Sequence, residues 1–387
     1  MKILLCALEP SADALGGALM AALRAKVPDV RFIGCGGAEM AAQGLDSLFD
    51  IEPFSVIGPT AALRLLPAAL KAADNLADLA SREAPDAAIF IDSWSFSRIA
   101  AEKFQRRAPG VKRFKYVAPQ IWASRPKRAQ KAAELFDGVL CLFEFETPMF
   151  ERAGARARFV GHSGFQAAHR YRADVAAFRR LHGFGDAPLL VVLPGSRRAE
   201  LRRHAGPFGE AVRRIADRVE GLRIVIPVTA SAAKSLPGTL EDWPGEPVVI
   251  DSAERFDAFA AADAALAASG TVVGELAIFS TPMIVAYRID LLTEIWARLV
   301  LTTKHVSLVN IAAGREVVPE FLQAECEPAA MADALTPLLT GGAERDAQEA
   351  AFPAIVEGWI GSAAPAAEMA AAAVLEWLDE RKTEEMS

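Results

Sequence analysis

The sequence contains few of the residues that hold metals or form disulfides. Among its 387 residues are only four cysteines and five histidines. The cysteines are far apart and form no Cys-x-x-Cys pair, and the histidines form no His-Glu-x-x-His or His-x-His pair. These absences argue against a zinc ribbon, a disulfide framework and a histidine metal site, and they favour a reduced, cytoplasmic compartment.

A basic excess and long apolar runs are missing too. The formal net charge is −7, whereas domains that coat nucleic acid usually carry a strong positive charge, so we expect no nucleic-acid partner. No run approaches the roughly 18 uncharged, apolar residues that a membrane-spanning helix needs. The composition, 52% apolar and 24% charged, excludes a disordered chain.

Several phosphate-binding and catalytic signatures are also absent. The sequence has no Walker A loop and no Gly-x-Ser-x-Gly elbow, and Gly34-Cys35-Gly36-Gly37-Ala38-Glu39 lacks the final glycine of a dinucleotide fingerprint. There is no Asp-x-Asp, the pattern of a metal-clamped diphosphate. We therefore expect a phosphate to be bound by helix N-termini and arginines, with neither a metal nor an organic cofactor.

What the sequence does contain is a repeated alternation of short apolar runs, small-residue turns and longer Ala-rich segments of helical period. This alternation predicts an α/β fold with parallel sheets. The strands expected in a first series are Lys2–Leu8, Arg31–Cys35, Ala87–Ile91, Phe114–Val117, Gly138–Cys141 and Ala157–Val160. A second series comprises Leu189–Leu193, Arg223–Ile226, Val248–Ile250, Ala264–Ala267 and Met283–Ala286.

Two series of strands predict two Rossmann-like domains that face a central cleft. A stretch without strands near residues 160–185 separates the series, so the expected domains are residues 1–165 and 185–360. The chain length agrees with two domains, because single hydrophobic cores stop growing at about 250–300 residues. Residues 363–382 are expected to form an amphipathic helix that packs on the first domain.

Ligands of open parallel sheets bind beyond the carboxyl ends of the strands, so candidate site residues are sought in the turns that follow them. The first strand is followed by Ser11 and Asp13, which either expose helix amides to a ligand or only cap the helix. The third strand delivers Asp92, which either accepts a proton from a substrate hydroxyl or caps a helix.

The turn after the fourth strand combines an aromatic side chain with cations. Its candidate residues are Trp122, Arg125 and Arg128. In an acidic protein such a local concentration of positive charge suits an anionic ligand. The charge pattern alone favours the plainer alternative, a basic helix whose charges face solvent.

Two turns of the second domain have the composition of a diphosphate site. In one, Gly195 allows close backbone approach, Ser196 can donate a hydrogen bond, and Arg197 can grip phosphate oxygens at a helix start. In the other, Ser269-Gly270-Thr271 begins a helix on which Glu275 shares a face with Thr271. The hydroxyls suit phosphate, and the carboxylate of Glu275 can accept hydrogen bonds from ribose; a capped structural helix is the alternative.

Over nearly its whole length the sequence resembles the lipid A disaccharide synthases, inverting glycosyltransferases of the GT-B architecture. The longest and most specific matching stretch is Ser307–Glu320. The other matching stretches, in the family's order, are Glu9–Gly16, Ile91-Asp92, Pro119–Arg128, Val139–Glu146, Phe159–His162, Leu193–Glu200 and Ala268–Glu275.

The resemblance implies a donor, UDP-2,3-diacylglucosamine, in the second domain and an acceptor, 2,3-diacylglucosamine 1-phosphate, in the first. The acceptor 6-hydroxyl would attack the anomeric carbon and yield a β-1,6 disaccharide 1-phosphate and UDP. In this scheme Arg197 and Ser269-Gly270-Thr271 bind the diphosphate, Glu275 and Asn310 bind the nucleoside side, and Asp92 is the general base.

The sequence departs from the family pattern almost entirely in the first domain, so donor binding is a safer expectation than acceptor identity. Carboxylates are lost where the family has Gly-x-x-Glu and Asp-x-Pro-Asp, which in a phosphorylated-acceptor site either lowers repulsion or removes a base. The departing residues are Ala12 in Ser11-Ala12-Asp13, Ala61 in Gly58-Pro59-Thr60-Ala61, Ser95 after Asp92, Ser124 in Trp122-Ala123-Ser124-Arg125, and Ser163 after Gly161-His162.

Ala61–Lys71 is apolar with flanking cations, and composition alone favours an ordinary core-facing helix. With the lipid substrates that the resemblance implies, we interpret it instead as a segment that lies at a membrane surface or takes up acyl chains. The protein is therefore expected in the cytoplasm, bound peripherally to the inner membrane. The sequence leaves the oligomeric state open, a homo-oligomer included. Two alternatives also stay open: a UDP-sugar enzyme of the same fold with another acceptor or an epimerase activity, and a non-catalytic UDP-sugar or lipid-binding protein.

Overall fold

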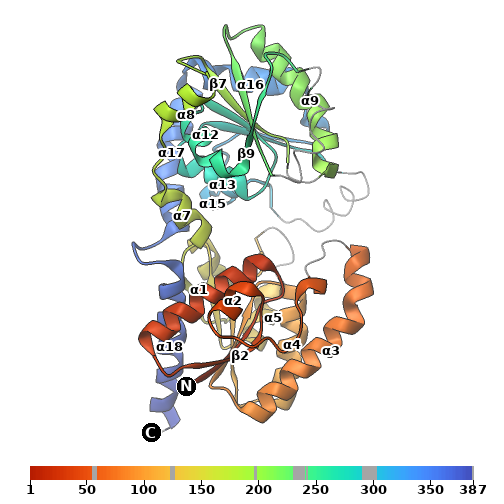
Figure 1. Cartoon of the computed structure of the whole chain (residues 1–387), viewed down its shortest axis with the longest axis vertical. Helices are drawn as coiled ribbons and strands as arrows, with labels where there is room; N and C mark the ends of the chain where they lie inside the picture. Colours follow the sequence, from red (N-terminus) through yellow and green to blue (C-terminus); the bar gives the residue numbers. More distant parts are fainter. Residues whose placement is uncertain are drawn as a thin grey trace. The chain divides into compact units, whose positions relative to one another are not determined.

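The computed structural model describes residues 1–54, 59–122, 127–195, 198–229, 240, 243–289 and 303–385. The chain divides into two compact units. Unit 1 comprises Met1–Gln166 and Trp359–Ser387, and unit 2 comprises Ala167–Gly358. Each unit is built on its own parallel six-stranded sheet, with helices on both faces (Figure 1).

The sheet of unit 1 has the strand order β2-β1-β3-β4-β5-β6. Its strands are almost wholly apolar because a parallel sheet is covered on both faces. Two hydrophobic clusters, one on each face, contain alternate residues of β1 and β3. The strands are β1 (Lys2–Cys6), β2 (Arg31–Cys35), β3 (Ala87–Ile91), β4 (Lys112–Tyr116), β5 (Gly138–Cys141) and β6 (Ala157–Phe159).

The helices of unit 1 cover the two faces in separate groups. One face is packed by α1 (Pro10–Lys26), α2 (Ala38–Ala42) and α18 (Ala366–Glu385). The other face is packed by α3 (Pro59–Glu83), α4 (Trp94–Arg107), α5 (Lys127–Leu135) and α6 (Thr147–Glu151).

The C-terminal helix α18 lies in unit 1, beside α1 (Figure 1). Its Trp377 packs so closely on β5 that a Cβ at Gly138 would lie 2.3 Å from the indole ring. Arg158 of β6 forms two hydrogen bonds to the carboxylate of Glu376, of 2.6 and 2.7 Å. A large side chain at position 138 would therefore displace the helix.

Unit 2 has the strand order β12-β11-β10-β7-β8-β9. The strands are β7 (Leu189–Leu193), β8 (Arg223–Val228), β9 (Val248–Asp251), β10 (Ala264–Ala267), β11 (Met283–Tyr287) and β12 (Glu320–Leu322). On one face lie α9 (Arg198–Ala216) and α16 (Pro328–Thr340), and on the other α8 (Val175–Leu181), α12 (Arg255–Ala261) and α13 (Thr271–Ile278). The other α-helices among the described residues are α15 (Leu308–Ala313), α7 (Ser163–Arg170) and α17 (Ala343–Ile360). The last two continue across the division between the units.

The predicted α/β fold class is confirmed, and every strand expected from the sequence is present with small shifts at its ends. The first strand ends at Cys6, two residues earlier than expected, although Ala7 and Leu8 are still buried. One strand, β12, was not expected, because its three residues begin with Glu320 and are too few to show an alternating pattern. Residues 167–184, expected to separate the domains, belong to unit 2, where α8 packs on α12.

Each sheet has one point at which the strand order reverses direction. In unit 1 this switch point lies between β1 and β3, and in unit 2 it lies between β7 and β10. Ligands of doubly wound sheets bind at such points, beyond the carboxyl ends of the strands. The turns after these four strands are therefore the places where each unit is expected to bind a ligand.

Candidate functional site

Two carboxylates meet at the switch point of unit 1. Glu9 follows β1 and precedes α1, and Asp92 follows β3 directly. Burial, and to a lesser extent the negative charge of Asp92, raises the pKa of Glu9. Glu9 was not among the predicted site residues, because its proximity to Asp92 depends on the pairing of β1 with β3.

The main chain at Asp92 is held in an uncommon conformation. Asp92 has a φ of +50° and Ser93 a φ of +39°, in the left-handed region that non-glycine residues rarely enter. Asp92 N–H donates to the carbonyl of Tyr116 (2.9 Å), and Ser97 Oγ donates to the carbonyl of Asp92 (2.8 Å). Within the described ranges the hydrogen bonds at Asp92 involve its main chain, and none involves its carboxylate.

The structure gives Asp13 a structural position. Its side chain is 4% exposed, and its carboxylate accepts hydrogen bonds from the backbone N–H groups of Gly37 (2.7 Å), Glu39 (2.9 Å) and Met40 (3.1 Å). Asp13 lies on α1 but caps the N-terminus of α2, a partner 24 or more residues away. Ser11 is exposed in the first turn of α1. The contact of either residue with an acceptor stays a prediction.

A buried carboxyl group, that of Glu146, holds the side chain of Trp122 in place. Trp122 Nε1 donates to Glu146 Oε1 (3.1 Å), and the backbone N–H of Phe143 donates to Glu146 Oε2 (3.2 Å). Burial raises the pKa of Glu146 from 4.5 to about 7. The Trp122 ring contacts Phe145 with centroids 6.0 Å apart, and Phe145 stacks on Phe143 at 5.6 Å. Trp122 and Phe145 are half-buried and Phe143 is buried, so the three rings form a partly exposed aromatic cluster.

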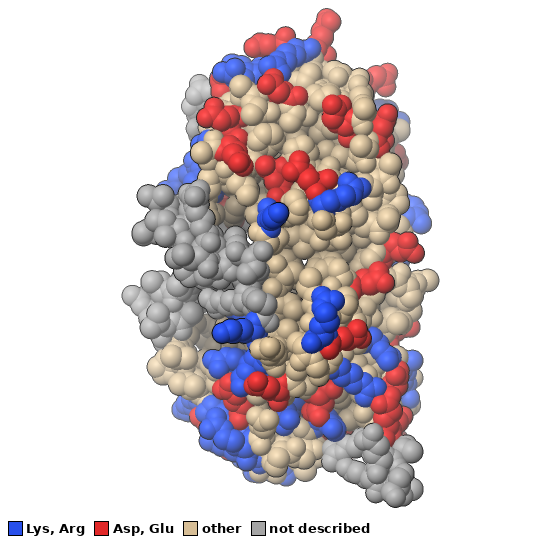
Figure 2. All heavy atoms as spheres, turned by 180° about the vertical axis from the view of Figure 1, so that it is seen from behind, with Lys and Arg blue, Asp and Glu red and all other residues tan. Residues whose placement is uncertain are grey.

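The structure describes only some of the residues predicted beside Trp122. Ser124 and Arg125 lie outside the described residues. Arg128 is half-buried in the first turn of α5. Figure 2 shows that on one face of the molecule cationic and acidic side chains are interspersed, so that face carries no extended patch of one charge.

His162 extends the aromatic cluster. Its ring stacks on Phe143 (5.7 Å) and on Phe165 (4.2 Å), and its Nδ1 accepts a hydrogen bond from the backbone N–H of Phe165 (3.2 Å). Burial lowers the pKa of His162 from 6.5 to about 4. The imidazole is therefore neutral near pH 7.

A His162→Asn variant should remove one pH-dependent part of the stability. Because the folded state disfavours the protonated imidazole, its contribution to the free energy of unfolding is complete above pH 6.5 and is lost as the pH falls through 4. The free energy of unfolding of the wild type, relative to that of the variant, should therefore fall by about 3 kcal/mol as the pH falls from 6.5 to 4. Urea unfolding measures it. Glu146 titrates in the opposite sense but is present in both proteins. A difference independent of pH would contradict the account.

Unit 2 has a cavity of about 460 Å³ at its switch point. It is lined by the turns after β7 and β10 and by the carboxyl end of β8, with Gly195, Ser269, Gly270, Thr271 and Glu275 among the lining residues. The structure therefore brings together five of the residues predicted for the donor. Ser196 and Arg197 lie outside the described residues, directly after Gly195.

A buried histidine contacts the main chain of the turn after β7. His204 is fully buried; one ring nitrogen, Nδ1, lies 2.7 Å from the carbonyl of Pro194, and Nε2 accepts from the N–H of Arg288 (3.0 Å). Burial lowers the pKa of His204, which favours the neutral ring that these contacts require. Gly195 has a φ of +112°, and a Cβ there would lie 2.6 Å from Glu200 Cβ, so this turn needs glycine.

The turn after β10 places a helix N-terminus and a carboxylate on the cavity. α13 begins at Thr271, and Ser269 Oγ donates to the carbonyl of Val306 (3.1 Å). One turn into the helix, Glu275 binds the guanidinium of Arg255 through both carboxylate oxygens, at 3.1 and 3.2 Å. Arg255, which also lines the cavity and stacks on Phe256, was not predicted, because it follows a different strand.

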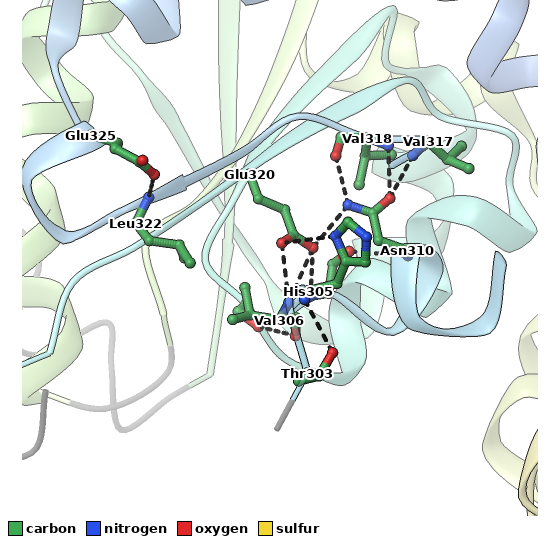
Figure 3. Close-up of polar contacts among 11 residues, drawn as sticks. Thr303, His305, Val306, Asn310, Val317, Val318, Glu320, Leu322 and Glu325 are labelled. Carbon is green, nitrogen blue, oxygen red and sulfur yellow. Dashed lines mark hydrogen bonds and ion pairs between the residues drawn. The ribbon is translucent and has the colours of Figure 1, made fainter. Parts of the chain in front are cut away.

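Asn310 lies at the centre of a buried polar cluster (Figure 3). Its Nδ2 donates to the carbonyl of Val318 (2.8 Å) and to Glu320 Oε1 (2.9 Å), and its Oδ1 accepts from the N–H groups of Val317 (2.7 Å) and Val318 (3.0 Å). Glu320 also accepts from the N–H of Ser307 (2.8 Å). These contacts occupy the amide of Asn310 and join α15 to β12; a contact with the nucleoside stays a prediction.

Comparison with known proteins begins with family models. The model of the lipid-A-disaccharide synthetase family matches residues 3–374. A lipid-A-disaccharide synthase of Ruegeria pomeroyi is 41% identical over 359 residues, which cover 90% of this chain and 88% of the relative. The chain belongs to the lipid-A-disaccharide synthetase family. The resemblance seen in the sequence motifs is thereby confirmed.

Solved structures agree on the architecture of this family member. A UDP-GlcNAc 2-epimerase from Neisseria meningitidis bound to UDP-GlcNAc aligns with a TM-score of 0.57, 11% identity and coverage of 98% of this chain and 100% of the other. The calicheamicin glycosyltransferase CalG4 aligns with a TM-score of 0.57, 15% identity and 98% coverage of both chains. The lipid-A-disaccharide synthetase fold of this chain is thus the two-sheet GT-B fold, and the chain is a glycosyltransferase.

Two further properties bear on the synthetase site. Among the helices of the described ranges, none combines the length and the apolar character that crossing a bilayer requires. In the same ranges no three His, Cys, Asp or Glu side chains are grouped so that they could hold a metal ion.

Proposed function

We propose that the chain transfers 2,3-diacylglucosamine from UDP-2,3-diacylglucosamine to the 6-hydroxyl of 2,3-diacylglucosamine 1-phosphate. The product is the β-1,6 disaccharide 1-phosphate, formed with inversion, and UDP leaves. The observation that carries this proposal is membership of the lipid-A-disaccharide synthetase family over residues 3–374. The cavity at the switch point of unit 2 and the carboxylate at that of unit 1 supply sites for the two substrates.

The donor's UDP group is assigned to the cavity of unit 2. The N-terminus of α13, with Thr271 as its first residue, offers backbone N–H groups and the positive end of the helix dipole to the diphosphate. Arg197, the second residue after Gly195 in the sequence, is proposed to add a guanidinium. Glu275, held by Arg255, presents carboxylate oxygens whose remaining lone pairs can accept ribose hydroxyls.

Asp92 is assigned as the general base. Its carboxylate takes the proton of the acceptor 6-hydroxyl while the hydroxyl oxygen forms a bond to the anomeric carbon. The bond from that carbon to the diphosphate oxygen breaks at the same time, and the electron pair leaves with UDP. Helix amides and Arg197 stabilise the negative charge on the leaving group, so the scheme requires no metal.

Lipid substrates place the protein at a membrane. On α3 the side chains of Leu66 and Leu70 are 44% and 39% exposed, although Ala69, between them, packs against the core. Exposed leucines on a helix that also carries Lys71 suit contact with a lipid surface. We therefore assign the protein to the cytoplasm, peripherally associated with the inner membrane.

The proposed reaction is tested by incubating the purified protein with UDP-2,3-diacylglucosamine, with and without 2,3-diacylglucosamine 1-phosphate. UDP release and product mass are followed. We expect release only when the acceptor is present, together with a disaccharide 1-phosphate. Turnover of the donor alone would indicate hydrolysis or epimerisation, and binding without turnover would indicate a non-catalytic protein; either result would overturn the proposal.

A further inference from the structure

Lys115 is a buried lysine at a position where β4 should carry an apolar residue. Its neighbours Phe114 and Tyr116 face the hydrophobic cluster beneath α1 and α18, so Lys115 projects to the opposite face of the sheet. The residue is 1% exposed. Burying an ammonium group is costly unless the charge is well compensated, so its presence here requires a reason.

The surroundings of Lys115 are largely apolar. The helices α3, α4 and α5 present alanine, leucine and phenylalanine residues to this face of the sheet. The titratable groups near it are Asp92 at the end of β3 and Cys6 on β1, whose Sγ lies 3.4 Å from that of Cys35 on β2; Cys141 of β5 belongs to the same hydrophobic cluster. Burial lowers the pKa of Lys115 from 10.5 to about 7, while the charge of Asp92 acts against this shift.

Three backbone carbonyls bind the ammonium group of Lys115. Nζ donates to the carbonyls of Phe90 (3.3 Å), Tyr116 (3.1 Å) and Asp92. A lysine ammonium has three N–H donors, so the group is fully satisfied without a paired carboxylate. Its partners are Phe90, the last residue but one of β3, Tyr116, the last residue of β4, and Asp92, which follows β3 directly.

The contact with the Asp92 carbonyl links Lys115 to the strained turn. Asp92 and Ser93 both have a positive φ, and such conformations persist only where the surrounding structure holds them. Hydrogen bonds from three donors hold this turn. The donors are Lys115 Nζ, Ser97 Oγ and the N–H of Asp92 itself. The ammonium also lies near Asp92, whose negative charge favours the charged form of Lys115.

We propose that Lys115 is a positioning residue for Asp92: its Nζ ties the Asp92 turn to the carboxyl-terminal parts of β3 and β4 and so orients the carboxylate that accepts the substrate proton. The inference rests on the proposed role of Asp92. It does not require Lys115 to touch either substrate.

The test compares Lys115→Met, which removes charge and donors, with Lys115→Gln, which keeps donors but removes the charge. Lys112→Met at the other end of β4 is the matched control, because Lys112 pairs with Asp137 (2.8 Å) in a partly exposed position away from Asp92. We expect Lys115→Met to lower kcat about ten- to a hundredfold, since a small misplacement of a catalytic group has an effect of that size. The Lys112 variant should stay within about twofold of wild type. The KM for the donor should be unchanged in all.

The division of the effect between kcat and KM separates positioning from a loss of folded protein. Because Lys115→Gln can still donate hydrogen bonds to the carbonyls around the Asp92 turn, it should retain more of kcat than Lys115→Met, with the same KM for the donor. A variant that only folds less well would lose kcat in proportion to its loss of folded protein. UDP affinity and circular dichroism verify that each variant is folded.

Every outcome either supports or overturns the proposed role of Lys115. Unchanged kcat in Lys115→Met, or a loss of kcat that only matches the loss of folded protein, would overturn the inference. If neither variant folds, Lys115 serves stability and the inference also fails. A wild-type protein without acceptor-dependent UDP release would instead refute the proposed function, so the two failures are distinguishable.

Discussion

Replacing Asp92 by Asn is expected to lower kcat for disaccharide formation by about 10²–10⁴-fold, because the general base contributes a factor of this size. Asparagine tolerates the left-handed conformation that the structure shows at this position, with a φ of +50°, so the turn should be retained. The loss should therefore lie in proton transfer and not in folding. UDP affinity should be unchanged, because the UDP site is assigned to unit 2.

The control for this prediction is Asp78→Asn. Asp78 forms an exposed ion pair with Arg107 (2.8 Å), and an exposed pair contributes little to stability, so its loss should change kcat by less than about twofold. Steady-state rates with saturating donor and acceptor measure both variants. Full activity of Asp92→Asn combined with loss of activity in Glu9→Gln would identify Glu9 as the base and refute the assignment of Asp92.

Replacing Asn310 by Ala is expected to lower the free energy of unfolding of unit 2 by roughly 2–5 kcal/mol. The substitution leaves the N–H groups of Val317 and Val318 without their acceptor and removes a donor from Glu320 (Figure 3). Each buried group that loses its partner costs about 1–3 kcal/mol. Urea or thermal unfolding measures the change.

The matched control is Asn75→Ala, at an exposed position on α3, which should leave stability almost unchanged. In the folded fraction of Asn310→Ala, UDP should bind with near-wild-type affinity. A variant with wild-type stability but greatly weakened UDP binding would contradict the structural role and support the nucleoside contact that the sequence motif predicts.

The fold could be predicted from the sequence because parallel strands are buried on both faces. A strand such as Leu189–Leu193 is a continuous apolar run bounded by turn residues, and its burial in the structure is complete along its length. The strand β12 could not be predicted, since Glu320 at its start serves the cluster around Asn310 and not the core. Short elements defined by long-range contacts leave no periodic pattern.

The sequence predicts a site residue only where a side chain of suitable chemistry stands in a turn that follows a strand. Gly195, Thr271 and Asp92 stand in the turns that follow strands, so the topology alone indicates them. Arg255 and Lys115 could not be found in this way, because each acts on a partner brought near by the fold: Glu275, 20 residues away, and the Asp92 carbonyl, 23 residues away. Asp13 is the opposite case. It was predicted as part of a ligand-binding turn, but its carboxylate accepts hydrogen bonds from the N-terminus of α2.

The account depends most on one claim, that unit 2 binds a uridine diphosphate through helix amides and an arginine without a divalent ion. Calorimetric titration of UDP into the protein, with and without EDTA, tests it most directly. We predict equal affinity in both conditions, and an affinity weaker by about 1.5–3 kcal/mol, or roughly 10- to 150-fold, in Arg197→Ala. Absence of UDP binding, or binding that EDTA abolishes, would contradict the claim.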